Sequence, residues 1–163
     1  MSDSVGVVAT QRAVLTQHGP LVLVSGAELA HVEVAYETYG TLSPARDNAV
    51  FVCHALTGDA HAAGWHEGAV RPGWWDNLIG PGKALDTDRF FVVSANLLGG
   101  CSGTTGPQSL DPVTGRAHGP DFPALDMADL VAVHRGLLDH LGIDRLHAAV
   151  GGSLGGCRCW SGR

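Results

Sequence analysis

Residues 146–156 read Leu-His-Ala-Ala-Val-Gly-Gly-Ser-Leu-Gly-Gly, and this stretch decides the fold. A short apolar run leads directly into a Gly-x-Ser-x-Gly pattern centred on Ser153. That order is typical of a nucleophile elbow, a strand-to-helix turn so tight that its serine takes a strained backbone conformation. The residues two before and two after the serine must then be small, and they are Gly151 and Gly155. The turn would raise the Ser153 hydroxyl above the sheet and direct the backbone N–H of Leu154 toward an oxyanion.

The residues before the elbow decide between this interpretation and a glycine-rich turn with an incidental serine. The chain contains 23 glycines, so a Gly-x-Ser-x-Gly pattern can also arise in an ordinary glycine-rich turn. However, a helix is predicted to begin after an Asp126 N-cap and to end at Gly142. Its apolar side carries Met127, Leu130, Val131, His134, Leu137, Leu138 and Leu141. A helix–glycine–strand unit therefore precedes the turn, which favours the elbow, and His134 is interpreted as a packed histidine rather than a catalytic one.

Apolar runs elsewhere predict the rest of the sheet. Residues 49–53 and 90–94 are continuous apolar segments, as expected for central strands covered on both faces, and 146–150 is a third. Residues 21–24 and the alternating, half-exposed stretch 31–39 are predicted to form an antiparallel hairpin at the start. The fold class is therefore α/β, with a mainly parallel sheet and antiparallel N-terminal strands.

Composition limits the classes of function. A length of 163 residues suits one domain, and a net charge of −6 argues against binding nucleic acid or an anionic membrane surface. The N-terminus has no secretory signal pattern, and no apolar run is long enough to span a bilayer, so we expect a cytoplasmic protein. The four cysteines fit no zinc or disulfide spacing.

Histidines raise the question of a metal site. Three of the nine, His54, His61 and His66, are close in sequence. A metal site needs ligands presented on one face of a helix or strand, and this segment is a loop rich in glycine and alanine. We therefore predict no metal.

A second oxyanion donor is expected after an earlier strand. The apolar run ending at Cys53 enters a small-residue turn, His-Ala-Leu-Thr-Gly, in which Leu56 is the candidate donor. Residues 96–107 follow another strand and should line the ligand crevice, because loops at the carboxyl ends of strands do so in open α/β sheets. The glycines at 99–106 lack the Gly-Lys-Ser/Thr ending of a phosphate-binding loop, which argues against a nucleotide site there.

Five motifs together resemble one family. They are His-Ala-Leu-Thr-Gly-Asp-Ala-His at 54–61, Gly-Trp-Trp at 73–75, Ile-Gly-Pro-Gly-Lys-Ala-Leu-Asp-Thr at 79–87, Asn-Leu-Leu-Gly-Gly-Cys-Ser-Gly-Thr-Thr-Gly-Pro at 96–107 and Gly-Gly-Ser-Leu-Gly-Gly at 151–156. Over about Leu21 to Gly156 the chain resembles the homoserine O-acetyltransferases, which are α/β-hydrolase-fold acyltransferases of methionine biosynthesis.

The resemblance implies a reaction and its participants. Ser153 would take an acetyl group from acetyl-CoA and pass it to L-homoserine, with the N–H groups of Leu56 and Leu154 as the oxyanion hole. The loop 96–107 would help to exclude water. The family implies acetyl-CoA as co-substrate, no permanently bound cofactor and a homodimer of full-length chains. Succinyl-CoA as donor, serine as acceptor, a plain serine hydrolase and a non-enzymatic binding module remain alternatives.

The catalytic partners of the serine are not in the sequence where the fold requires them. In this fold the acid and then the histidine follow the nucleophile, yet only ten residues follow Ser153 and none is histidine. Using His54 or His61 as the catalytic base would reverse the order of catalytic residues along the chain that the family has. We therefore interpret residues 1–163 as the N-terminal part of a single α/β-hydrolase domain, truncated just after the elbow. Expressed alone, this chain is expected to aggregate and to show no acyl transfer.

The last seven residues suggest the origin of the truncation. The family continues with a run such as Met-Gln-Val-Leu-Glu-Trp-Ala, whereas residues 157–163 read Cys-Arg-Cys-Trp-Ser-Gly-Arg. With one choice of codons for the family run, deletion of its first base gives Cys-Arg-Cys-Trp-Ser-Gly followed by a codon that can encode Arg. We interpret 157–163 as an out-of-frame tail produced by a one-base shift in the gene or in its sequencing.

Sequencing the gene for several hundred bases past codon 163 tests this interpretation. We expect a second reading frame that encodes the family's later motifs, including an aspartate and a histidine in family context. An uninterrupted frame that stops after Arg163, with no related frame downstream, would contradict the frameshift.

Overall fold

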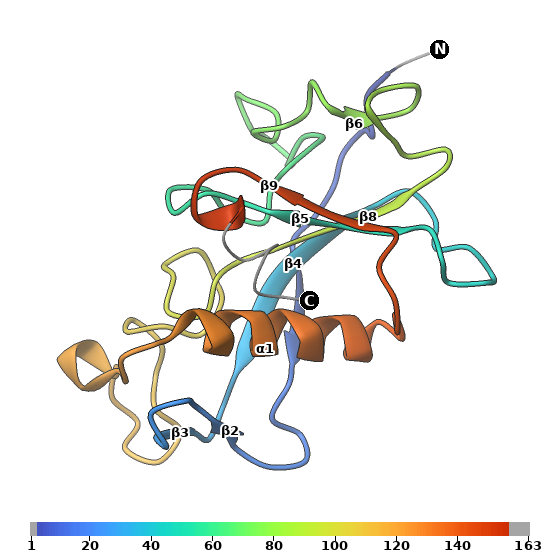
Figure 1. Cartoon of the computed structure of the whole chain (residues 1–163). Coiled ribbons are helices and arrows are strands. Elements are labelled where there is room, and N and C mark those ends of the chain that lie inside the picture. Colours follow the sequence, from blue (N-terminus) through green and yellow to red (C-terminus); the bar gives the residue numbers. More distant parts are fainter. Residues whose placement is uncertain (1–2, 157–163) are drawn as a thin grey trace.

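A five-stranded mixed sheet forms the centre of the computed structural model, which describes residues 3–156 (Figure 1). Its strands, in the order β1-β4-β8-β5-β9, are β1 (Gln11–Val14), β4 (Glu33–Tyr39), β8 (Phe91–Ala95), β5 (Ala49–Cys53) and β9 (Ala148–Gly151). β4 is antiparallel to both of its neighbours, whereas β8, β5 and β9 are mutually parallel. The predicted α/β class, with antiparallel strands first, is confirmed. The tail 157–163 lies outside the described residues.

The predicted N-terminal hairpin is wrong in its pairing. The remaining elements are β2 (Leu21–Val22), β3 (Glu28–Leu29), β6 (Ile79–Gly80), β7 (Leu85–Asp86), the 3-10 helix η1 (Gly119–Asp121) and α1 (Met127–His140). β2 turns back onto β3 in a small separate sheet, and β4 takes β1 as its antiparallel partner instead. The sequence does not predict β1, because the strand is mostly polar and Ala13 is its one buried residue.

Helix α1 begins and ends at the predicted residues. Its N-cap is Asp126, whose side chain accepts from the backbone N–H of Ala128 at 2.9 Å. Asp129 completes a capping box by accepting from the Asp126 N–H at 2.8 Å. At the other end Gly142 has φ +68°, the left-handed conformation that terminates helices. No helix described within residues 3–156 is long and apolar enough to cross a membrane.

The two faces of the sheet are covered differently. α1 covers one face, where Val133 and Leu137 join a core that includes Phe51 and Val93. A long connection, residues 54–87, covers the opposite face, and in Figure 1 it lies on the far side of the sheet from α1. Most of that cover is irregular chain, so backbone polar groups must find partners within it.

β9 is the strand predicted at 146–150, and it lies at one edge of the sheet. In the described part of the chain β9 pairs with β5 alone, so it forms the edge of the sheet. Ala149 is exposed there, and Ala148, Val150 and Gly151 are half-buried. An apolar strand of this kind leaves one row of backbone groups available for pairing.

Candidate active site

Ser153 occupies a strained turn between a strand and a helical turn. β9 ends at Gly151, and residues 154–156 form the helical turn that follows. Ser153 itself has φ +57°, a left-handed conformation that costs a residue with a side chain about 1–2 kcal/mol. Its side chain is exposed. The turn has the backbone geometry expected of a nucleophile elbow.

The end of β5 leaves no room for a side chain at either glycine of the elbow pattern. A Cβ atom on Gly151 would lie 2.5 Å from the carbonyl oxygen of Cys53, and one on Gly155 would lie 2.0 Å from the same oxygen. Cys53 and Gly151 are also direct partners in the parallel ladder. The close approach of the two backbones therefore explains why small residues stand at these two positions.

The turn after β5 is equally compact. The Gly58 N–H donates to the Ala55 carbonyl at 2.9 Å, which closes a four-residue turn with Leu56 in its second position. A Cβ on Gly58 would approach the Cβ of His54 to 2.8 Å, so this position also needs glycine. Leu56 has 73% of its surface exposed, and its backbone N–H donates to no residue among those described.

A cavity of about 350 Å³ joins these two turns. It is lined by both predicted oxyanion donors, Leu56 and Leu154, and by residues 96–102 of the loop after β8. Like the N–H of Leu56, that of Leu154 makes no hydrogen bond within the described chain. Two unused N–H donors at one cavity are the arrangement that can stabilise a developing oxyanion.

The loop after β8 is fastened to β4 by two threonines. Thr104 Oγ1 accepts from the Ala35 N–H and Thr105 Oγ1 accepts from the Glu33 N–H, each at 2.9 Å. The Asn96 N–H donates to the Ala35 carbonyl at 2.9 Å, so the loop continues the antiparallel pairing of β8 with β4. This wall of the cavity is therefore held by the backbone of β4.

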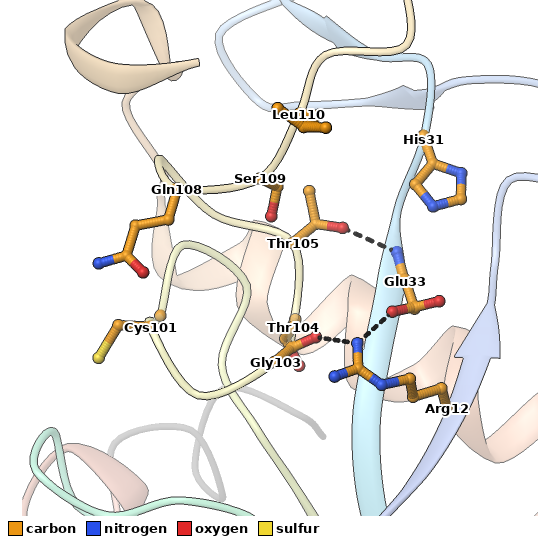
Figure 2. Close-up of a pocket in the computed structure, with 11 residues that line it drawn as sticks. Arg12, His31, Glu33, Cys101, Gly103, Thr104, Thr105, Gln108, Ser109 and Leu110 are labelled. Carbon is orange, nitrogen blue, oxygen red and sulfur yellow. Dashed lines mark hydrogen bonds and ion pairs between the residues drawn. The ribbon is translucent and has the colours of Figure 1, made fainter. Parts of the chain in front are cut away.

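The same loop borders a second pocket, of about 470 Å³, shown in Figure 2. Gly100 and Cys101 line both this pocket and the first cavity. The Arg12 guanidinium forms an ion pair with Glu33 and donates to the Gly103 carbonyl at 3.1 Å. Because Arg12 is already engaged, this pocket has no unpaired cation among its lining residues.

No acid–base partner reaches Ser153 within residues 3–156, where no side chain is hydrogen-bonded to its hydroxyl. His54 is buried, and its Nδ1 donates to the Ala55 carbonyl at 2.6 Å. His134 is buried against Phe51, as predicted for a packed histidine. Within residues 3–156, the predicted nucleophile Ser153 and the predicted oxyanion donors Leu56 and Leu154 are therefore present without a side chain hydrogen-bonded to the serine hydroxyl.

A buried polar cluster around Glu37 was missed by sequence reasoning. β4 was predicted to be half-exposed, but Glu37 is only 1% exposed because the connection after β5 covers it. Its carboxylate accepts from His61 Nδ1 at 3.0 Å, from His66 Nε2 at 2.7 Å and from the Tyr39 hydroxyl at 2.8 Å. Burial, followed by the neighbouring carboxylate, raises the pKa of Tyr39, so the phenol stays protonated and donates. No local signal distinguishes this glutamate from a solvent-exposed one.

Comparison with known proteins identifies related chains. Residues 48–161 match the family model described as alpha/beta hydrolase fold. A homoserine O-succinyltransferase from Nocardioides sp. is 71% identical over 157 residues, covering 96% of this chain and 42% of the relative. A homoserine O-acetyltransferase from Methanobrevibacter ruminantium is 56% identical over 153 residues, covering 94% of this chain and 31% of the relative. The chain thus spans 42% and 31% of the lengths of these two relatives.

A solved structure gives the same fold. The crystal structure of esterase E22 superposes with a TM-score of 0.85 at 38% identity, covering 93% of this chain and 42% of the esterase.

Replacing one elbow glycine tests the close approach at β5. We expect Gly155→Ala to lower the free energy of unfolding by about 3 kcal/mol, because its methyl group would meet the Cys53 carbonyl at 2.0 Å. Gly152→Ala is the matched control, since a Cβ there meets nothing within 4 Å. Both variants, like the Ser153 variants below, are made in a full-length chimera that joins residues 1–156 to the later part of the Nocardioides relative. Urea unfolding followed by circular dichroism measures their stability. Equal losses in the two variants would contradict the proposed packing.

Relieving the strain at the elbow should stabilise the fold. Ser153→Gly is expected to raise the free energy of unfolding by about 1 kcal/mol, because glycine adopts φ +57° without the steric cost. Ser153→Ala removes the same hydroxyl and keeps the strain, so it should leave stability nearly unchanged. Thermal unfolding of the two variants separates backbone strain from loss of the hydroxyl. A Ser153→Gly protein no more stable than Ser153→Ala would contradict this account.

Proposed function

Because the chain belongs to the α/β-hydrolase fold family, we propose that it carries the nucleophile and oxyanion hole of a homoserine O-acyltransferase. The observation that carries the proposal is the strained elbow at Ser153, because the next residue, Leu154, lines one cavity with Leu56 and the N–H groups of both leucines make no hydrogen bond within residues 3–156. The names of the two relatives supply the acceptor and the class of donor. Both relatives are longer than this chain, so the activity is proposed for the protein of which these residues form a part.

The proposed reaction proceeds in two transfers. The Ser153 hydroxyl attacks the thioester carbonyl of the acyl-CoA, and the N–H groups of Leu56 and Leu154 stabilise the resulting oxyanion. The thioester C–S bond then breaks, the CoA thiol leaves with a proton, and the acyl group stays on Ser153. The side-chain hydroxyl of homoserine attacks this ester and releases the serine. In this fold the base that moves these protons follows the nucleophile in the chain, so we expect it beyond residue 156.

Acetyl-CoA is the donor that we propose, on the motif resemblance and the 56% identical relative. Succinyl-CoA is the competing donor, favoured by the name of the 71% identical relative. Nothing in the described cavity distinguishes them by charge, because its lining residues include no arginine or lysine that could pair with a succinyl carboxylate.

Ester hydrolysis is the second candidate function, and the superposition with esterase E22 favours it. Transfer and hydrolysis share the acyl-serine and differ in whether water or the homoserine hydroxyl attacks it. The loop at 96–107 supports transfer. Its hydrogen bonds to β4 give the cavity a fixed wall, and a cavity with a fixed wall can exclude the water that would hydrolyse the acyl-serine.

A full-length chimera tests the proposal. Residues 1–156 are joined to the part of the Nocardioides relative that this chain does not match, and CoA release is followed with a thiol reagent. We expect homoserine-dependent release of CoA from an acyl-CoA donor, whereas the donor preference of this chimera reports on the relative's part, because nothing in the described cavity distinguishes the two donors by charge. Ser153→Ala should abolish this release.

Leu56 provides a sharper test of the oxyanion hole. Leu56→Pro removes the backbone N–H, and proline suits the second position of the turn closed by Gly58 and Ala55. We expect kcat to fall by about 10²- to 10³-fold, whereas Leu56→Ala retains the N–H and should stay near the parent value. Equal activity of the two variants would contradict the role of Leu56. Hydrolysis of p-nitrophenyl acetate without homoserine-dependent transfer would favour the esterase instead.

A further inference from the structure

The buried carboxylate of Glu37 is surrounded by potential metal ligands. Glu37 lies within β4, on the sheet face opposite α1, and is 1% exposed. One carboxylate oxygen accepts from His66 and from the Thr10 hydroxyl, at 2.7 and 2.9 Å. The other accepts from His61 and from the Tyr39 hydroxyl, at 3.0 and 2.8 Å. Segments before, within and after β4 and β5 therefore converge on a single acidic group.

The three groups that could bind a metal are close together. One ligand atom from each of Glu37, His61 and His66 lies within 4.8 Å of the other two. The two imidazole rings are stacked, with centroids 3.7 Å apart and planes inclined by 28°. Two imidazoles and a carboxylate form a ligand set that proteins use for zinc and for other first-row divalent ions, with water in the remaining position.

The ligand atoms would have to adjust their spacing around an ion. Tetrahedral zinc with bonds of about 2.0–2.1 Å holds its ligand atoms about 3.4 Å apart. His66 can make most of that adjustment, since its side chain is 37% exposed and it sits at the rim of the cluster. Glu37 is already oriented by the hydroxyls of Thr10 and Tyr39, as the supporting partners of metal-binding carboxylates are.

The negative charge of the buried Glu37 carboxylate also favours a bound cation. A buried carboxylate is stable only when its charge is balanced. Among residues 3–156, Glu37 forms ion pairs only with the two histidines, and no lysine or arginine reaches it. A divalent ion bound at the cluster would balance the charge of Glu37.

Two buried polar atoms beside the cluster lack partners. His61 Nε2 and the Ser94 hydroxyl have no hydrogen bond within the described residues. Ser94 is the direct partner of Glu37 in the antiparallel β4–β8 ladder, so both side chains project from the same face. Unpaired buried polar atoms in a native protein indicate ordered water or an ion.

An entry route from solvent adjoins the cluster. His66 and Glu67 line a pocket of about 380 Å³, together with residues 7–10 of the N-terminal segment. Glu67 is exposed, so its carboxylate is available to an ion entering by this pocket. The pocket gives a hydrated cation access to His66 without opening the core.

We propose that Glu37, His61 and His66 bind one divalent ion of the zinc class. The ion would fasten the connection after β5 to the middle of β4. The site is separate from the cavity at Leu56 and Leu154, since none of its three residues lines that cavity. The proposal therefore does not depend on the acyl-transfer function.

Cobalt titration of the full-length chimera described above, stripped of metal with EDTA, tests the site. We expect visible d–d absorption of a low-symmetry Co²⁺ complex to saturate at one equivalent and to be reversed by Zn²⁺. Absorption from thiolate-to-cobalt charge transfer should be absent, because no cysteine belongs to the proposed ligand set. Thiolate bands, or no saturable binding, would overturn the proposal.

Variants assign the ligands. His66→Asn should weaken Co²⁺ and Zn²⁺ binding at least 100-fold, and Glu37→Gln should do the same. His31→Asn is the control, because His31 is an exposed histidine outside the cluster. Circular dichroism in EDTA shows whether each variant folds like the parent. Unchanged affinity in a folded His66→Asn protein would overturn the assignment.

A measurement on the parent chain removes any dependence on how the variants fold. Histidine side-chain ¹⁵N resonances are recorded with and without one equivalent of Zn²⁺. We expect one nitrogen of His61 and one of His66 to shift to the range of metal-bound imidazole, while His134 stays unchanged. Shifts confined to other histidines would overturn the proposal.

Discussion

The backbone at the end of β5 and the backbone of the elbow approach so closely that no side chain fits between them. The Cys53 carbonyl faces the positions where Gly151 and Gly155 would carry a Cβ. Parallel pairing of Cys53 with Gly151 sets this distance, and the sharp turn at Ser153 brings the chain back over the same carbonyl. The turn after β5 and the residue after Ser153 are therefore neighbours because of strand pairing. Side-chain contacts are not needed to bring Leu56 and Leu154 to one cavity.

The sheet depends on different interactions on its two faces. On the α1 face, buried residues such as Val133 and Leu137 exclude water without directional bonds. The opposite face is covered by irregular chain, whose polar groups must be paired one by one. The Tyr39 hydroxyl shows how this is done, since it accepts from the N–H groups of Ala62 and Ala63 while donating to Glu37. One phenol thus satisfies two backbone donors and links them to a buried acid.

Sequence reasoning succeeded where the determinants are local. The cap at Asp126, the stop at Gly142 and the glycines around Ser153 each act within a few residues of one another, so their spacing can be recognised. It failed where partners are distant. The strand Gln11–Val14 pairs with residues 19 to 25 positions away, and its polar sequence carries no apolar alternation.

Glu37 shows a second limit of sequence reasoning. The alternation through β4 predicts one solvent-exposed face of the strand, and a glutamate on that face is predicted to be exposed. It is buried because the connection after β5 folds over it, an event set by the tertiary structure and invisible in the local pattern. The histidines in that connection could be noted from sequence, but their shared partner lies on another strand. A metal-ligand set assembled from a strand and a distant loop leaves no spacing motif.

The segment that carries Leu56 is fixed at both of its ends. At one end, Cys53 is locked by the ladder and by the elbow glycines. At the other, the N–H groups of Ala62 and Ala63 are held by Tyr39, and His61 is held by Glu37. Only a short turn, itself closed by a hydrogen bond, lies between these anchors. The backbone that carries the proposed donor Leu56 is therefore held in place before any ligand arrives, and a donor on a preorganised backbone can stabilise developing charge without reorganising.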